Sequence, residues 1–135
     1  YHVDFSLEFA SNAMQNSTGT GGSPGDSVYV KIGAVSNKPQ RYLDDSNTYQ
    51  INLDKGNQGQ DGKDMVLIGT IGVDTANSTY RLKTLPYLPD EAIQAKLANY
   101  SILTDASGQA WIIVGTDSGF ESTTTIFYRR SGCAK

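Results

Sequence analysis

The chain opens on Tyr1-His2-Val3-Asp4-Phe5-Ser6-Leu7-Glu8-Phe9, nine residues in which apolar and polar side chains alternate strictly. Successive side chains of a strand point to opposite faces, so this period of two predicts a β-strand with one buried face. The strand has no turn or cap before it, and we therefore expect the chain to be the C-terminal part of a longer precursor. The next segment, Ala10–Gly25, is rich in Ser, Asn, Thr and Gly and predicts a long loop.

Further short runs of apolar, β-branched and aromatic residues recur along the chain, separated by turn-forming residues. They predict strands at Ser27–Val35, Thr48–Leu53, Met65–Ile71, Thr79–Leu85, Tyr100–Thr104, Trp111–Val114 and Thr123–Tyr128. One helix is expected near 89–98, because Pro89 and two acids precede Ile93 and Leu97, which lie one helical turn apart.

Many short strands with one short helix predict an all-β fold. We expect residues 1–135 to form a single antiparallel β-sandwich of the jelly-roll, galactose-binding-like type. The residues expected in the core are Tyr1, Val3, Phe5, Val28, Val30, Ile51, Leu53, Val66, Ile68, Trp111, Ile113 and Phe127.

Composition argues against several classes of function. The net charge is −3 and no basic cluster exceeds Arg129-Arg130, which argues against a nucleic-acid partner. No apolar stretch approaches the roughly 20 residues of a transmembrane helix. With His2 as the one histidine and Cys133 as the one cysteine, histidine-based zinc sites and Cys–His nucleophiles are not expected. Cys133 is expected to be a free thiol, with an intermolecular disulfide as the alternative.

Four blocks of the sequence resemble a family of bacterial secreted proteins or lipoproteins of unassigned function. The blocks are Phe5–Asn12, Gly21–Tyr29, Asp54–Gln58 and Trp111–Glu121. The resemblance implies a secreted, periplasmic or outer-surface location and a jelly-roll-like sandwich. It supplies no catalytic residue, and the helix near 89–98 departs from the family's pattern.

Carboxylates are the remaining candidates for catalysis, because a glycosidase needs two acids about 5–10 Å apart. Nothing in their spacing selects a pair from Glu8, Asp26, Asp54, Asp117 and Glu121.

Calcium in a loop stays open as a structural cofactor, because hard cations take carboxylate and carbonyl oxygens. Asp54–Gly59 begins like an EF-hand loop, but its twelfth position is Met65 where the motif needs Glu. Gly21–Asp26 is a single near match to a calcium-binding repeat that works in arrays. The alternative is that the Asp and Asn residues of these loops bond nearby backbone amides in Asx turns.

The binding site is predicted where the loops Asp54–Asp61 and Gly115–Ser122 meet at one end of the sandwich, with Gly21–Asp26 beside them. Phe120 beside the carboxylates of Gly115–Ser122 would suit a sugar ring, and the alternative is a glycine-shaped connection in which Phe120 is buried. The proposed ligand-binding residues are Asp54, Asn57, Asp117, Ser118 and Glu121.

Three functions stay open. The first is a non-catalytic module that binds a glycan or another envelope component. The alternatives are a purely structural domain of an envelope protein and a glycoside hydrolase that uses carboxylates.

Overall fold

The computed structural model describes residues 4–86, 90–98 and 100–134. Its elements are β1 (Asp4–Ser11), β2 (Val28–Val35), β3 (Arg41–Leu43), β4 (Tyr49–Ile51), β5 (Met65–Thr70), β6 (Arg81–Leu85), α1 (Glu91–Ala98), β7 (Trp111–Ser118) and β8 (Ile126–Ala134).

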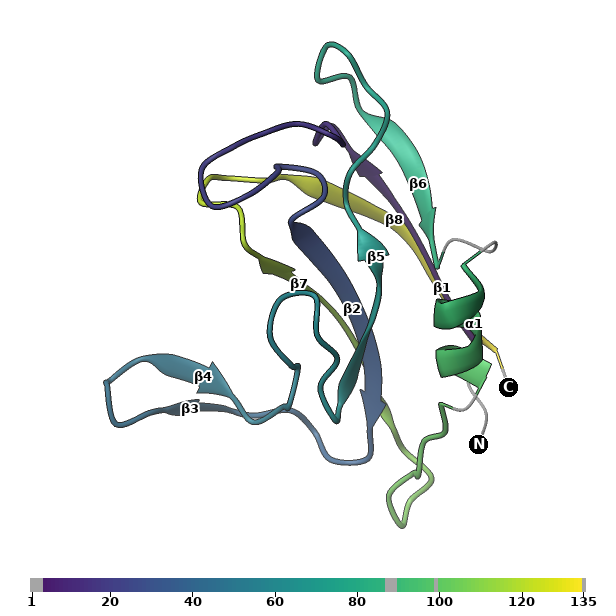
Figure 1. Ribbon diagram of the computed structural model, residues 1–135. Coiled ribbons are helices and arrows are strands. Elements are labelled where there is room, and N and C mark those ends of the chain that lie inside the picture. The colour runs from purple at the N-terminus through teal and green to yellow at the C-terminus, as the bar shows by residue number, and fades with distance from the viewer. Residues whose placement is uncertain (1–3, 87–89, 99, 135) are drawn as a thin grey trace.

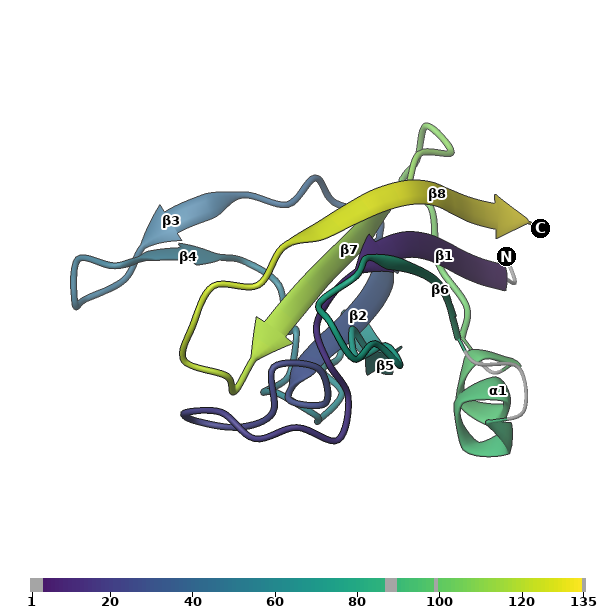
Figure 2. The same cartoon turned by 90° about the horizontal axis from the view of Figure 1, so that it is seen from above.

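The strands form two antiparallel three-stranded sheets and a separate hairpin. One sheet has the order β6-β1-β8 and the other the order β5-β2-β7, while β3 and β4 pair only with each other. Figure 2 shows the two sheets as layers, and the hairpin projects from them to one side in both views. The predicted all-β sandwich is confirmed, and its jelly-roll topology stays a prediction.

The core lies between the two central strands. The opening alternation holds, because Phe5, Leu7 and Phe9 of β1 are all buried. They belong to the same apolar cluster as buried residues of β2 and β5, among them Val30 and Ile68. Four core residues of the second sheet were predicted correctly, namely Val28, Val30, Val66 and Ile68.

Three other core predictions are wrong. Ile51 is exposed because it lies in the projecting hairpin, and Trp111 begins β7 at the edge of its sheet, with Lys38 over its ring. Phe127 is exposed because its position in β8, opposite Ala10, points away from the core. Leu53 and Ile113 are only half-buried. Tyr1 and Val3 lie outside the described residues.

Several strand boundaries also differ from the prediction, among them those of the last strand, which begins at Ile126 instead of Thr123 and ends at Ala134 instead of Tyr128. Tyr100–Thr104 does not form a strand, because Tyr100 is fixed instead by bonds between its hydroxyl and the backbone of Ala34 in β2. Gly115–Ser118, expected in a loop, continues β7, because these residues pair with β2 up to the contact of Ser118 with Val28. The hairpin strand β3 carries no pattern that predicted it.

The single expected helix is present as α1. Asp90 caps it, since its Oδ1 accepts a hydrogen bond from the backbone N–H of Ile93 at 3.1 Å. Within the described part of the chain, none of the helical structure has the length and apolarity needed to span a bilayer.

The second face of β2 is buried as well, which the alternation in its sequence does not predict. Lys31 and Gly33 point away from the sheet interface, yet both are buried. The loop before β5 covers them: a Cβ at Gly33 would overlap the carbonyl oxygen of Asp64. This covering loop contains one of the predicted binding segments.

Candidate functional site

The loop from Asp54 to Asp64 is closed by its own two ends. The Asp54 N–H donates to Oδ2 of Asp64 at 2.8 Å, and the Asp64 N–H donates to the Asp54 carbonyl at 2.9 Å. The Asp54 carboxylate accepts the backbone N–H groups of Lys63 at 3.0 Å and Gly56 at 3.1 Å. These two bonds lower the pKa of Asp54. Asp54 thus holds the loop shut through Asx-turn chemistry.

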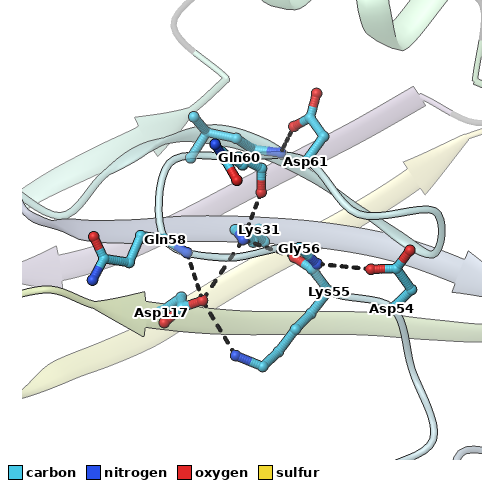
Figure 3. Close-up of polar contacts among 9 residues, drawn as sticks. Lys31, Asp54, Lys55, Gly56, Gln58, Gln60, Asp61 and Asp117 are labelled. Atoms are coloured by element: carbon cyan, nitrogen blue, oxygen red, sulfur yellow. Dashed lines mark hydrogen bonds and ion pairs between the residues drawn. The ribbon is translucent and has the colours of Figure 1, made fainter.

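Lys31 fills the centre of this loop with its ammonium group (Figure 3). Its Nζ donates to the carbonyl oxygens of Lys55 at 2.7 Å and Gln60 at 2.8 Å, and lies 3.8 Å from Oδ2 of Asp117. The side chain is 2% exposed. Burial lowers the pKa of Lys31, and the charge of Asp117 opposes that shift.

Asp117 joins this loop to β7. It lies opposite Tyr29 in the pairing of β7 with β2, and its Oδ2 accepts the Gln58 N–H at 2.9 Å. Lys55 reaches the same oxygen at 3.2 Å. Partial burial raises the pKa of Asp117, but the bonds from Gln58 and Lys55 outweigh it, so this pKa lies below its ordinary value.

The structure brings the three predicted loops together at one end of the sandwich. The Gly119 N–H donates to the Ser27 carbonyl at 2.8 Å, and the Glu121 N–H donates to the Thr20 carbonyl at 2.9 Å. A Cβ built at Gly119 would lie 3.5 Å from the side-chain oxygen of Gln58. The segments are therefore neighbours, although the loop after β7 begins at Gly119.

Several predicted binding groups of this end have internal partners. The Ser118 hydroxyl donates to the Phe120 carbonyl at 2.9 Å and accepts the Phe120 N–H at 3.1 Å. Phe120 is partly buried and packs against the core, which agrees with the structural alternative for this loop. Asn57 and Glu121 are exposed. Asn57 uses its backbone carbonyl to accept the Gln60 N–H at 2.9 Å.

The cation bound at this end of the sandwich is the ammonium group of Lys31. The carbonyls of Lys55 and Gln60 and the Asp117 carboxylate are oxygens of the kind that calcium takes, and the Lys31 ammonium occupies them. Among the described residues, no group of three or more His, Cys, Asp or Glu side chains is arranged to hold a metal ion.

A second candidate surface lies on the outer face of the β6-β1-β8 sheet. Ala10 of β1 pairs with Leu82 on one side and Phe127 on the other, so all three share the face opposite to the core. Tyr80 meets Phe127 edge to face, with ring centroids 5.3 Å apart. Tyr80, Leu82 and Phe127 are 44%, 55% and 58% exposed. We call these four residues the outer aromatic face.

Charged groups border this face. Glu8 lies two residues before Ala10 on the same side of β1, and its Oε1 is 3.3 Å from Nη1 of Arg129. Sequence reasoning missed the surface because it assigned Phe127 to the core. The available signal is the alternation of Tyr80 with Leu82, which has the same pattern as a buried stripe.

Comparison of the chain with protein-family models, with curated proteins and with solved structures finds no match. The resemblance to secreted bacterial proteins therefore stays a prediction.

Proposed function

We propose that this chain is an extracytoplasmic, non-catalytic binding module that holds carbohydrate on its outer aromatic face. The observation that carries the proposal is the exposed pair of rings, Tyr80 and Phe127, on the solvent-facing side of the β6-β1-β8 sheet. Most exposed apolar residues of a protein are scattered singly, whereas clusters of them mark interaction surfaces. The extracytoplasmic location rests on the family resemblance alone.

The chemistry of the face suits sugars. The C–H faces of a pyranose pack on aromatic rings, and its hydroxyl groups need polar partners close by. Glu8 accepts hydrogen bonds and Arg129 donates them, and both side chains are accessible at 29% and 63% exposure. A ligand on Phe127 therefore has both partners within reach along the same strands.

Two of the carboxylates at the loop end of the sandwich are less suited to bind or cleave a sugar. The carboxylates of Asp54 and Asp117 already accept backbone and lysine donors, and their pKa values are lowered. A glycosidase needs one carboxylic acid with a raised pKa to protonate the leaving group. Every carboxyl group with a resolved pKa shift among the described residues has its pKa lowered. For Asp54 and Asp117, the lowered pKa favours a structural role over that of a catalytic acid.

Calorimetric titration with cellohexaose, xylohexaose, chitohexaose and solubilised peptidoglycan tests the proposal. We expect one of these probes to bind, and Tyr80→Ala or Phe127→Ala to weaken it about tenfold, the loss of roughly one stacking contact. Tyr42→Ala is the matched control, because Tyr42 is a tyrosine of similar exposure, 51%, on the projecting hairpin. Binding that survives both ring substitutions, or no binding by any probe, refutes the proposal.

A further inference from the structure

The hairpin formed by β3 and β4, residues 41–51, is an arm that pairs with no other strand of the described residues. All six residues of its two strands are exposed. Among them Tyr42, Leu43, Tyr49 and Ile51 are 51%, 50%, 64% and 43% exposed. An isolated two-stranded hairpin is marginally stable in water, so apolar side chains on such an arm gain most when a partner covers them.

A groove lies between the two sheets, where β5 and β6 form their edges. It has a volume of about 820 Å³, within the range of pockets that enclose a drug-sized group. Its lining includes the buried apolar residues Ile68, Val73 and Leu85. Ile93 of α1 and Thr70 at the end of β5 complete that part of the wall.

The two strands that border the groove differ in their free edges. The edge of β5 is covered, because the Leu67 N–H donates to Oδ1 of Asp61 at 2.7 Å and the Gly62 N–H donates to the Met65 carbonyl at 2.9 Å. The second edge of β6 pairs with no other strand of the described chain. An unpaired edge of this kind is a template for an added strand.

The tip of the arm and the strand β6 carry opposite charges, while the acids of the groove lining, Asp74 and Asp90, lie outside β6. Arg81 is exposed at the start of β6 and lines the groove, and its side chain forms no ion pair within the described residues. Asp45 is exposed at the tip of the arm and is likewise without an ionic partner there. Beside it, Asp44 adds a second acid, whose pKa is lowered by bonds from Thr48 and Gln50. The tip is acidic where the edge of β6 is basic.

The arm cannot reach the groove of its own molecule. Figures 1 and 2 both show β3 and β4 extending away from the side on which β6 and α1 lie. We propose that the arm of one copy docks along β6 in the groove of a second copy, with Asp45 facing Arg81. Different surfaces of the two copies then meet, so the contact is head-to-tail and repeats into a ring or an open chain.

Sedimentation velocity of the whole chain tests this assembly. The weight-average mass should exceed about twice the monomer mass as the concentration rises from about 10 µM to about 1 mM, by mass action. Arg81→Glu alone and Asp45→Lys alone should each abolish the association, because the side chains at positions 45 and 81, which face each other in the contact, then carry charges of the same sign. An equimolar mixture of the two variants should restore it, because the residue at position 45 of each variant then meets a residue of opposite charge at position 81 of the other.

Two further variants distinguish docking in the groove from non-specific association. Thr70→Arg places a long side chain in the groove, and the double change Tyr49→Ser and Ile51→Ser removes apolar groups from the arm; each should leave a monomer. Circular dichroism confirms folding of each variant, and the surface charge variants keep the test intact where Thr70→Arg fails to fold. A monomer at every concentration, or association that all these changes leave unaltered, overturns the proposal.

Discussion

Replacing Lys31 with methionine isolates the role of the buried ammonium. Methionine keeps most of the apolar stem of lysine in place, so the substitution removes the charge and its hydrogen bonds with little loss of packing. The carbonyls of Lys55 and Gln60 lose their donor, and Asp117 loses its more buried cation.

The expected loss of stability follows from those contacts. A buried acceptor left without a donor costs about 1–3 kcal/mol. Both carbonyls belong to exposed residues of a surface loop, so the lower end applies and two of them give about 2 kcal/mol. The larger figure of about 3–5 kcal/mol for breaking a buried ion pair does not apply. Asp117 keeps the Gln58 N–H and Lys55 as partners.

Thermal unfolding followed by circular dichroism measures the effect. For a chain of this length, a loss of about 2 kcal/mol corresponds to a fall in Tm of about 6–8 °C. Lys55→Met is the matched control, because Lys55 bonds the same Asp117 oxygen with a side chain that is 49% exposed. An exposed ion pair contributes about 0–1 kcal/mol, so this variant should change Tm by at most about 3 °C. Equal falls for the two variants would refute the claim that burial makes Lys31 structural.

Three further predictions concern Asp117, Gly33 and Tyr100. The lowered pKa of Asp117 contributes stability that is present above the unfolded value of about 3.9 and is lost as the pH falls through the folded value, so Asp117→Asn should flatten the acid limb of a stability–pH curve. Gly33→Ala should destabilise the fold by more than about 2 kcal/mol, because the added methyl group overlaps the Asp64 backbone. Gly115→Ala is the control and should be tolerated, because its methyl group meets only the flexible end of Met65 at 3.6 Å. Urea unfolding midpoints of the two variants measure the difference in stability. Tyr100→Phe removes the hydroxyl that bonds the backbone of β2 and should cost about 1–2 kcal/mol in the same assay.

The elements that could be predicted are those that local sequence patterns determine. The alternation through Phe5 to Phe9 predicted β1 and its buried face, and Pro89 with two acids ahead of Ile93 and Leu97 predicted the helix. The errors arose where tertiary contacts override local signals. Gly115–Ser118 has the composition of a turn, yet pairing with β2 holds it in a strand. Tyr100–Thr104 has the composition of a strand, yet forms none, and its Tyr100 hydroxyl bonds the backbone of Ala34 instead.

That the predicted loops are neighbours could be read from the sequence, but the contacts that join them could not. The sequence groups the Asp54–Asp61 loop with the end of β7, but it does not predict the bonds from Gln58 and Lys55 to Asp117. The decisive residue, Lys31, gave no signal, because a lysine on the polar side of an alternating strand is usually solvated. It is buried by a loop that begins more than twenty positions further along the chain, and only long-range contacts reveal that. The outer aromatic face was hidden for a related reason: exposed and buried apolar stripes look alike in sequence.

Amide chemical-shift mapping by NMR, with the bound hexasaccharide or peptidoglycan fragment as the probe, tests the central claim most directly. If the outer aromatic face holds the ligand, the shifted amides cluster at Leu82, Ala10 and Phe127, on three neighbouring strands, and at Tyr80 just before β6. Shifts confined to Asn57, Ser118 and Glu121, with that face unchanged, would contradict the account and return the binding site to the loop end of the sandwich.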